Sequence, residues 1–310
     1  MHIVTLRILL DPSIFGLTPG NWFWPYFAGF VVLAAGLFAR GKDIAQARGL
    51  EKLFALAPIF IAIPMAVFGS QHFTAAANVS TIVPAWIPFK LFWTILVGVA
   101  LEAAALSIAA KKCAQMAATL FAAMMIIFIL TMHIPNIMSQ KNVLFGGIGF
   151  RDLTFCAGAL AFAAIQMRSW RAGGTPAFVT VARIFIGAAA IFFGLAHFRH
   201  PEFLPAIDFD QLTPAWMPGH TLWAYAAGLI FVLAGIPLLL NQKPRLAALC
   251  LAFMGLTILL FVFLPLMISM LANIELGLNY FVSVLLFTGS TLLLAESLTD
   301  PPHRQQALIK

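Results

Sequence analysis

The sequence contains very little charge. Only 9% of its 310 residues are Asp, Glu, Lys or Arg, whereas 62% are hydrophobic. An ordinary soluble domain is about 25% charged, and a soluble fold needs polar side chains to cover its surface. The low charge therefore excludes a soluble globular protein and indicates a chain that folds in a lipid bilayer.

Several other signatures are absent. Strict alternation of polar and apolar residues does not occur, which excludes a membrane β-barrel and leaves helices as the spanning elements. The sequence has no C-x-x-C, and its cysteines lie in or beside apolar segments, where they are interpreted as small hydrophobic residues rather than metal ligands. It also has no G-x-x-x-x-G-K-[ST], G-x-G-x-x-G or H-E-x-x-H motif. These absences argue against phosphate-binding, dinucleotide-binding and zinc-protease chemistry.

Apolar segments dominate what is present. A helix needs about 20 apolar residues to cross the hydrocarbon of a bilayer. Nine such segments are predicted, at about 22–40, 53–73, 89–110, 113–135, 144–167, 177–198, 220–240, 245–270 and 277–297. The sequence therefore predicts an all-α membrane protein with about nine transmembrane helices.

The basic residues predict how these helices are oriented. With nine spans, most of them fall on one side of the membrane, in loops 40–52, 111–112, 168–175 and 241–245 and in the tail 298–310. The other side holds only Arg7, Lys90, Lys141 and Arg199. Because cytoplasmic loops are enriched in Lys and Arg, the N-terminus is predicted to be outside and the C-terminus cytoplasmic. The net charge of +7 is therefore interpreted as a topological signal, and no nucleic-acid partner is expected.

The chain repeats itself. F-G-S-Q-H-F at 68–73 returns as F-G-L-A-H-F at 193–198, and P-A-W-I-P at 84–88 returns as P-A-W-M-P at 214–218. The offset is 125 residues for the first motif and 130 for the second, and Pro135 matches Pro265 at the same 130. Each copy has four spans, an even number, so the copies have the same orientation and form parallel repeats related by a pseudo-twofold axis along the membrane normal.

These offsets predict four regions. Residues 1–52 form an interfacial segment, an extra first helix and a cytoplasmic loop. The first four-helix repeat is 53–167, the second is 177–297, and a cytoplasmic tail occupies 298–310.

A few ionisable residues lie inside the predicted spans, where charge is costly and normally faces a partner or a ligand. The candidate site residues are His72, Glu102, His133, Arg151, Asp152 and His197. Two interpretations stay open: a buried ion pair that holds the first repeat together, and a ligand-binding or proton-linked site that opens to the outside. The second copy has lost most of this set, because Val232, Phe263 and Phe281 stand opposite Glu102, His133 and Arg151.

The repeated signature resembles the DoxX-like family of four-helix membrane proteins. Residues 68–102 carry it in full, through the histidine motif, the P-x-W-x-P loop and then Trp93, Gly98 and Glu102. Residues 193–228 carry it without the final glutamate. The resemblance implies a bacterial inner-membrane protein linked to quinone or sulfur redox chemistry.

Three functions follow as hypotheses. The first is a redox-associated membrane subunit that binds a quinone and works with a redox enzyme partner. The second is a transporter for a small molecule, since parallel repeats with a polar site between them occur in such proteins. The third is a non-catalytic scaffold. A haem held by His72 and His197 is a further alternative, because the two histidines come from different helices at similar depth.

Overall fold

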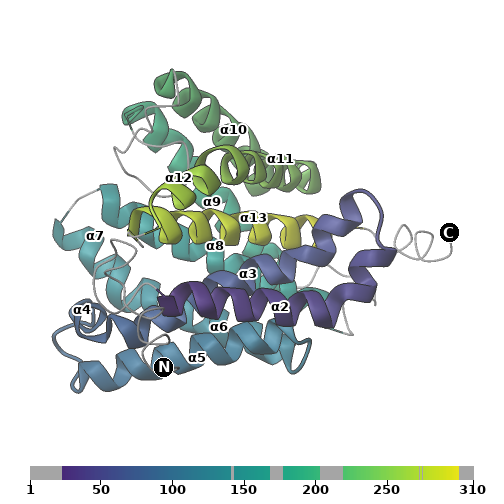
Figure 1. Ribbon diagram of the computed structural model, residues 1–310. Helices are drawn as coiled ribbons and strands as arrows, with labels where there is room; N and C mark the ends of the chain where they lie inside the picture. The colour runs from purple at the N-terminus through teal and green to yellow at the C-terminus, as the bar shows by residue number, and fades with distance from the viewer. Residues whose placement is uncertain are drawn as a thin grey trace.

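The computed structural model describes residues 23–140, 143–167, 177–202, 219–271, 273 and 275–299 (Figure 1). Within these ranges the regular structure is helical throughout, and nine helices are long and apolar enough to cross a membrane. The prediction of an all-α membrane protein with about nine spans is confirmed. The predicted interfacial segment before residue 23, the second P-x-W-x-P loop and most of the tail lie outside the described residues.

One extra helix precedes two equivalent sets. The extra helix is α2 (Phe23–Gln46). The first set is α3 (Leu50–Thr74), α4 (Ala76–Ser80), α5 (Lys90–Ala109), α6 (Ala114–Phe128), η2 (Ile129–His133), α7 (Ile134–Gln140) and α8 (Val143–Gln166). The second set is α9 (Ala177–Arg199), α10 (His220–Leu240), α11 (Pro244–Ile258), η4 (Leu259–Phe263), α12 (Leu264–Ser269), η5 (Glu275–Asn279) and α13 (Tyr280–Ser297).

The third span of each set contains a π-helical turn, and proline explains it. Pro135 and Pro265 lack an N–H, and their rings would collide with the carbonyl four residues earlier in a regular helix. The chain widens just before each proline, so that Ile134 N–H bonds to the carbonyl of Ile129, and Leu264 N–H to that of Leu259. Both bonds span five residues, the pattern of a π-turn. The two turns therefore arise from one repeated proline.

Left-handed backbone positions repeat at the same offset. Phe89 (φ 54°), at the start of α5, matches Gly219 (φ 66°), at the start of α10. After these helices, Lys111 matches Asn241 and Cys113 matches Lys243, all with positive φ. An L-residue rarely adopts this conformation, so three such matches 130 residues apart show one backbone plan used twice.

The fourth helix of each set also closes the ring of the other set. In the first set α3 packs on α5, α5 on α6 and α6 on α8, but the ring is closed by α13, which contacts both α8 and α3. In the second set α9, α10 and α11 follow in the same way, and α8 contacts both α13 and α9. Figure 1 shows α13 and α8 in the centre, with α10 and α11 on one side and α5 and α6 on the other. This arrangement agrees with the prediction of two parallel repeats related by a pseudo-twofold axis.

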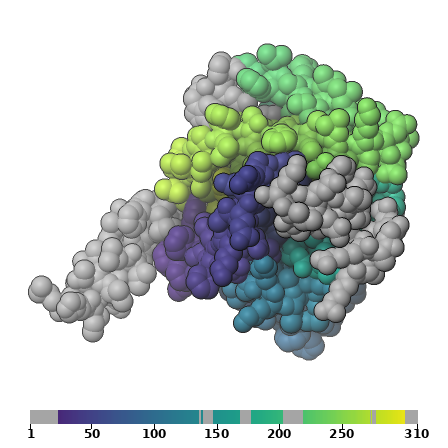
Figure 2. All heavy atoms as spheres, turned by 90° about the vertical axis from the view of Figure 1, so that its right-hand side faces the viewer, coloured from purple at the N-terminus to yellow at the C-terminus, as the bar shows by residue number. Residues whose placement is uncertain are grey.

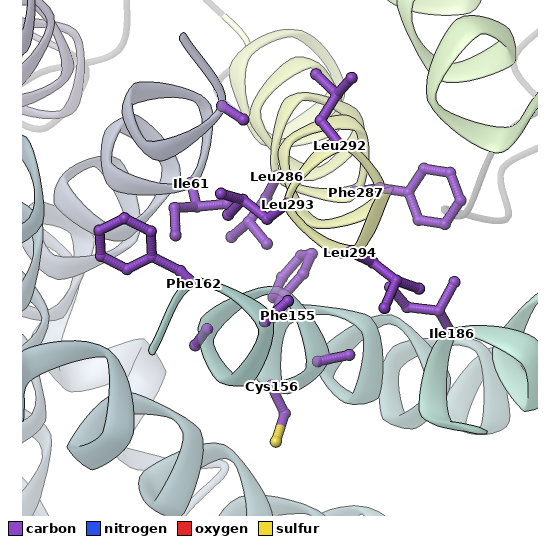
Figure 3. Close-up of a cluster of buried hydrophobic side chains, with 14 of the residues drawn as sticks. Ile61, Phe155, Cys156, Phe162, Ile186, Leu286, Phe287, Leu292, Leu293 and Leu294 are labelled. Atoms are coloured by element: carbon purple, nitrogen blue, oxygen red, sulfur yellow. The ribbon is translucent and has the colours of Figure 1, made fainter. Parts of the chain in front are cut away.

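Small residues allow this central crossing. A methyl group on Gly158 of α8 would come within 2.8 Å of Ser290 Cα in α13, and one on Gly289 would come within 3.1 Å of the Ala57 carbonyl in α3. Close approach through small residues is the usual way in which membrane helices associate. Around the crossing, large apolar side chains fill the space, including Ile61, Phe162, Ile186 and Leu293 (Figure 3).

The two ends of the molecule differ in charge. We call the end with the turn at Lys111 the basic end, and the opposite end, where α3 and α9 finish, the histidine end. At the basic end Lys111 Nζ lies 2.6 Å from Asp43 Oδ2, which joins the end of α2 to the turn after α5. Figure 2 shows this end, with the turn between α2 and α3 lying between the second set and α5–α6. The end of α2 and the turn after α5, both predicted to lie on one side of the membrane, are thus neighbours here.

Candidate functional site

A groove of about 500 Å³ opens between α2, α3 and α5. Its walls are mainly apolar, and its lining consists of Trp24, Phe27, Ala28, Val31, Val32, Ser70, Phe73, Thr74, Glu102 and Leu106. The side chains of Trp24 and Phe27 are 53% and 47% exposed. Because exposed side chains of α2 border it, the groove opens at the outer surface of the bundle.

Glu102 is the ionisable side chain among the residues that line the groove. It lies twelve residues into α5, roughly 18 Å from the start of that helix, so it is at mid-depth. Its stem packs on Gly69, where an added methyl group would lie 3.1 Å from Glu102 Cγ. The nearby Thr74 hydroxyl donates to the Ser70 carbonyl at 3.2 Å, so its proton is already engaged. The carboxyl of Glu102 is thus the polar group best placed to meet a ligand.

The histidine motif has a structural explanation in both sets. His72 Nδ1 lies 2.7 Å from the carbonyl oxygen of Phe68, and His197 Nδ1 lies 2.7 Å from that of Phe193. A carbonyl only accepts, so each Nδ1 carries the proton and donates it. Methyl groups on Gly98 and Gly228 would meet the Cβ atoms of these histidines at 2.8 and 3.1 Å. The histidine of the motif is therefore oriented by a bond within its own helix, and it packs the first helix of each set closely against a glycine of the second.

Arg151, Asp152 and His133 form a polar cluster near the histidine end. His133 Nε2 lies 2.9 Å from Asp152 Oδ2, and Arg151 Nε lies 3.4 Å from Asp152 Oδ1. The guanidinium carbon of Arg151 also lies 6.0 Å from the ring centre of Phe68 and 5.5 Å from that of Phe155, within the range of cation–π contacts. The cluster connects η2 to α8, and through Phe68 it also contacts α3.

The second set holds its π-turn without these charges. Phe263, which occupies the position of His133, packs edge-on against Tyr280 with ring centres 6.3 Å apart. Phe263 is fully buried, and Val282 stands at the position of Asp152. An aromatic contact is therefore sufficient to pack this turn against the fourth helix. The charges of the first set are not needed for that purpose.

The predicted site residues are distributed over three places. Glu102 lines the groove beside α2, whereas His133, Arg151 and Asp152 are joined near the histidine end of α8. His72 shares Phe68 with Arg151, since it bonds to the backbone of Phe68 while Arg151 lies over the ring. His197 is fully buried in the second set.

Sequence reasoning missed a buried arginine on α2, which lies beyond the lining of the groove toward the basic end. Arg40 of α2 is 6% exposed, and its Nη2 donates to the carbonyl of Ile108 at 3.0 Å. Its guanidinium carbon lies 5.9 Å from the ring centre of Phe162 in α8. The sequence assigned Arg40 only to a basic loop, because nothing in one sequence gives the rotation of α2 about its axis.

The comparisons with known proteins identify a family but no activity. The model of a family described as "Domain of unknown function (DUF8561)" matches residues 61–146 and 186–281, together more than half of the chain. The two matches begin 125 residues apart, the offset of the histidine motif. No curated protein and no solved structure matches the chain.

Proposed function

We propose that this chain, which belongs to the DUF8561 family, binds a lipid-soluble molecule of the quinone type in the groove between α2, α3 and α5. The observation that carries the proposal is a single carboxyl, Glu102, at mid-depth in a mainly apolar groove at the surface of the helical bundle. Small-molecule sites commonly combine apolar walls with a few placed polar groups. The ligand enters sideways from the lipid.

The depth of Glu102 restricts the head of the ligand. A phospholipid keeps its charged head at the membrane surface, because charge is costly in hydrocarbon. A head that reaches Glu102 is uncharged and forms hydrogen bonds. A carboxylic acid donates to a carbonyl, and a carboxylate accepts from a hydroxyl. A quinone offers the carbonyl and its quinol offers the hydroxyl, so one side chain serves both forms.

In this proposal the chain is the membrane-embedded subunit that holds the quinone, and a partner enzyme carries the electrons. This role fits the resemblance of residues 68–102 to the DoxX-like family. We propose that the protein lies in a bacterial inner membrane with the N-terminus outside and the basic end in the cytoplasm. The concentration of Lys and Arg at the basic end supports this orientation.

The same proposal gives the cluster of Arg151, Asp152 and His133 a functional rather than a purely structural role. The support is the second set, where the contact of Phe263 with Tyr280 packs the equivalent turn. With His72, which reaches the same Phe68, the cluster is an ionisable region on the histidine end of the first set.

A photoreactive quinone tests the proposal. Purified protein in lipid nanodiscs is expected to be labelled on α2 and α5, in competition with unlabelled quinone. Glu102→Val copies Val232 of the second set and should weaken binding about tenfold, since one hydrogen bond of about 1.4 kcal/mol corresponds to that factor. Glu51→Gln, an exposed acid at the start of α3, is the control and should bind as the unmodified protein does. Labelling confined to the second set would contradict the proposal.

Cys113 tests the orientation separately. It is exposed and lies in the turn at the basic end, whereas Cys250, also exposed, lies within α11. A membrane-impermeant maleimide is expected to label Cys113 in inside-out vesicles and not in intact spheroplasts, with Cys250 protected by lipid in both. Labelling of Cys113 in spheroplasts would place the basic end outside.

A further inference from the structure

Two arginines bind equivalent carbonyls in the two sets. Arg40 donates to the carbonyl of Ile108 near the end of α5, and Arg183 donates to the carbonyls of Leu238 and Leu239 near the end of α10. Ile108 and Leu238 are 130 residues apart, the offset of these helices. A cation at a helix C-terminus meets the negative end of the helix dipole and can bond to the carbonyls of the last turn. The second helix of each set is thus capped in the same way.

The two caps come from different helices. Arg183 belongs to α9, the first helix of its own set. At the offset of 125 that relates α9 to α3, its counterpart is Pro58, which has no side chain able to reach a carbonyl. In the first set the cap comes instead from α2, which has no counterpart in the second set. The cap therefore attaches the extra helix to the first set.

This attachment positions one wall of the groove. Five lining residues belong to α2, from Trp24 to Val32, and Arg40 follows two turns later on the same helix. Beyond it, Asp43 forms its ion pair with Lys111. The hydrogen bond of Arg40 and this ion pair therefore both attach α2 at the basic end. We infer that Arg40 is the positioning residue of the ligand groove: by binding the end of α5, it holds the outer part of α2 opposite Glu102. This inference rests on the proposed function for its binding readout only.

Three variants separate capping from positioning. Arg40→Leu removes the first cap, Arg183→Leu removes the second, and Arg40→Leu with Pro58→Arg returns a cap to the first set from α3. Each is measured for melting temperature and for quinone binding. The position of α2 is followed by spin labels on Phe27→Cys and Thr74→Cys, after replacement of Cys113 and Cys250 by Ser. Binding is measured on protein without labels.

Arg40→Leu and Arg183→Leu should each lower the melting temperature by about 5 °C. Of these two, only Arg40→Leu should broaden the distribution of distances between the spin labels and weaken quinone binding about tenfold. Arg40→Leu with Pro58→Arg should recover the melting temperature of the unmodified protein, while the distance distribution stays broad and quinone binding stays weak. Arg40→Lys, which keeps the charge, should restore part of both.

The inference would be overturned if adding Pro58→Arg to Arg40→Leu restored a narrow distance distribution and quinone binding. It would also be overturned if Arg183→Leu lost as much quinone binding as Arg40→Leu. If Pro58→Arg does not fold, the comparison of Arg40→Leu with Arg183→Leu still decides. If the unmodified protein binds no quinone, the proposed function fails, but the spin-label distances still decide whether Arg40 positions α2.

Discussion

The two sets of helices share a backbone and differ in chemistry. Their π-turns, their left-handed residues and their His–Gly contacts match at fixed offsets, so the second set serves as an internal control for the first. Where the first has Glu102 on Gly69, the second has Val232 on Gly194. The comparison teaches which polar groups the fold requires: the histidines and the capping arginines are needed twice, whereas the carboxylates occur once.

The largest expected effect comes from breaking the polar cluster in the first set. Asp152→Val leaves Arg151 and His133 without their carboxylate, and loss of one member of a buried charged group typically costs about 3–5 kcal/mol. The triple change to Phe, Val and Phe at His133, Asp152 and Arg151 copies the second set and should recover most of that loss. Unfolding in mixed micelles measures both. Equal stability of Asp152→Val and the unmodified protein would show that the cluster is not coupled.

A smaller effect is expected at the central crossing, which both sets share. Gly158→Leu would drive its side chain into Ser290 of α13, and overpacking of this kind costs about 1–3 kcal/mol. Gly41→Ala is the matched control, because nothing lies within 4 Å of the added methyl group. Unfolding measured in the same micelles should separate the two variants. A Gly158→Leu protein as stable as the control would mean that α8 and α13 can move apart freely.

The smallest effect tests the symmetry itself. His72→Phe and His197→Phe each remove the hydrogen bond to the carbonyl four residues earlier, worth about 0.5–1.5 kcal/mol. Because the two bonds have the same length, the losses in free energy of unfolding should agree within about 0.5 kcal/mol. A clearly larger loss in one set would indicate that the two histidines have diverged in role.

Much of the fold could be predicted from the sequence, because the lengths of the helices and the positions of the charged loops follow from the order of apolar and charged residues. Repeated short motifs such as those ending at His72 and His197 gave the duplication. The remainder depends on rotation about helix axes, which composition does not determine. Nothing in the sequence distinguishes Arg40, which turns inward to Ile108, from a basic residue of the loop. The sequence analysis did not predict the groove for the same reason: it gave α2 only as an extra helix, without the face that α2 turns toward α3 and α5.

Some signals were present and could have been used. Pro135 ends the predicted span 113–135 and Pro265 lies within the predicted span 245–270. Each helix therefore has to accommodate a proline, and a widened turn is one way to do so. The pairing of Phe89 with Gly219 also hinted at a left-handed position, because glycine prefers that conformation. By contrast, the contact of His133 with Asp152 depends on how η2 faces α8, and only coordinates provide that.

The closing of each ring by the fourth helix of the other set has a consequence for biogenesis. Each ring of helices is closed by a helix of the other set, and among the described spans α13 leaves the ribosome after all the others. Until it inserts, α3 and α8 both lack the neighbour that covers them, although all other helices of the first set are already in the membrane. The nascent protein therefore remains an open assembly until α13 inserts, and that one helix completes both rings together.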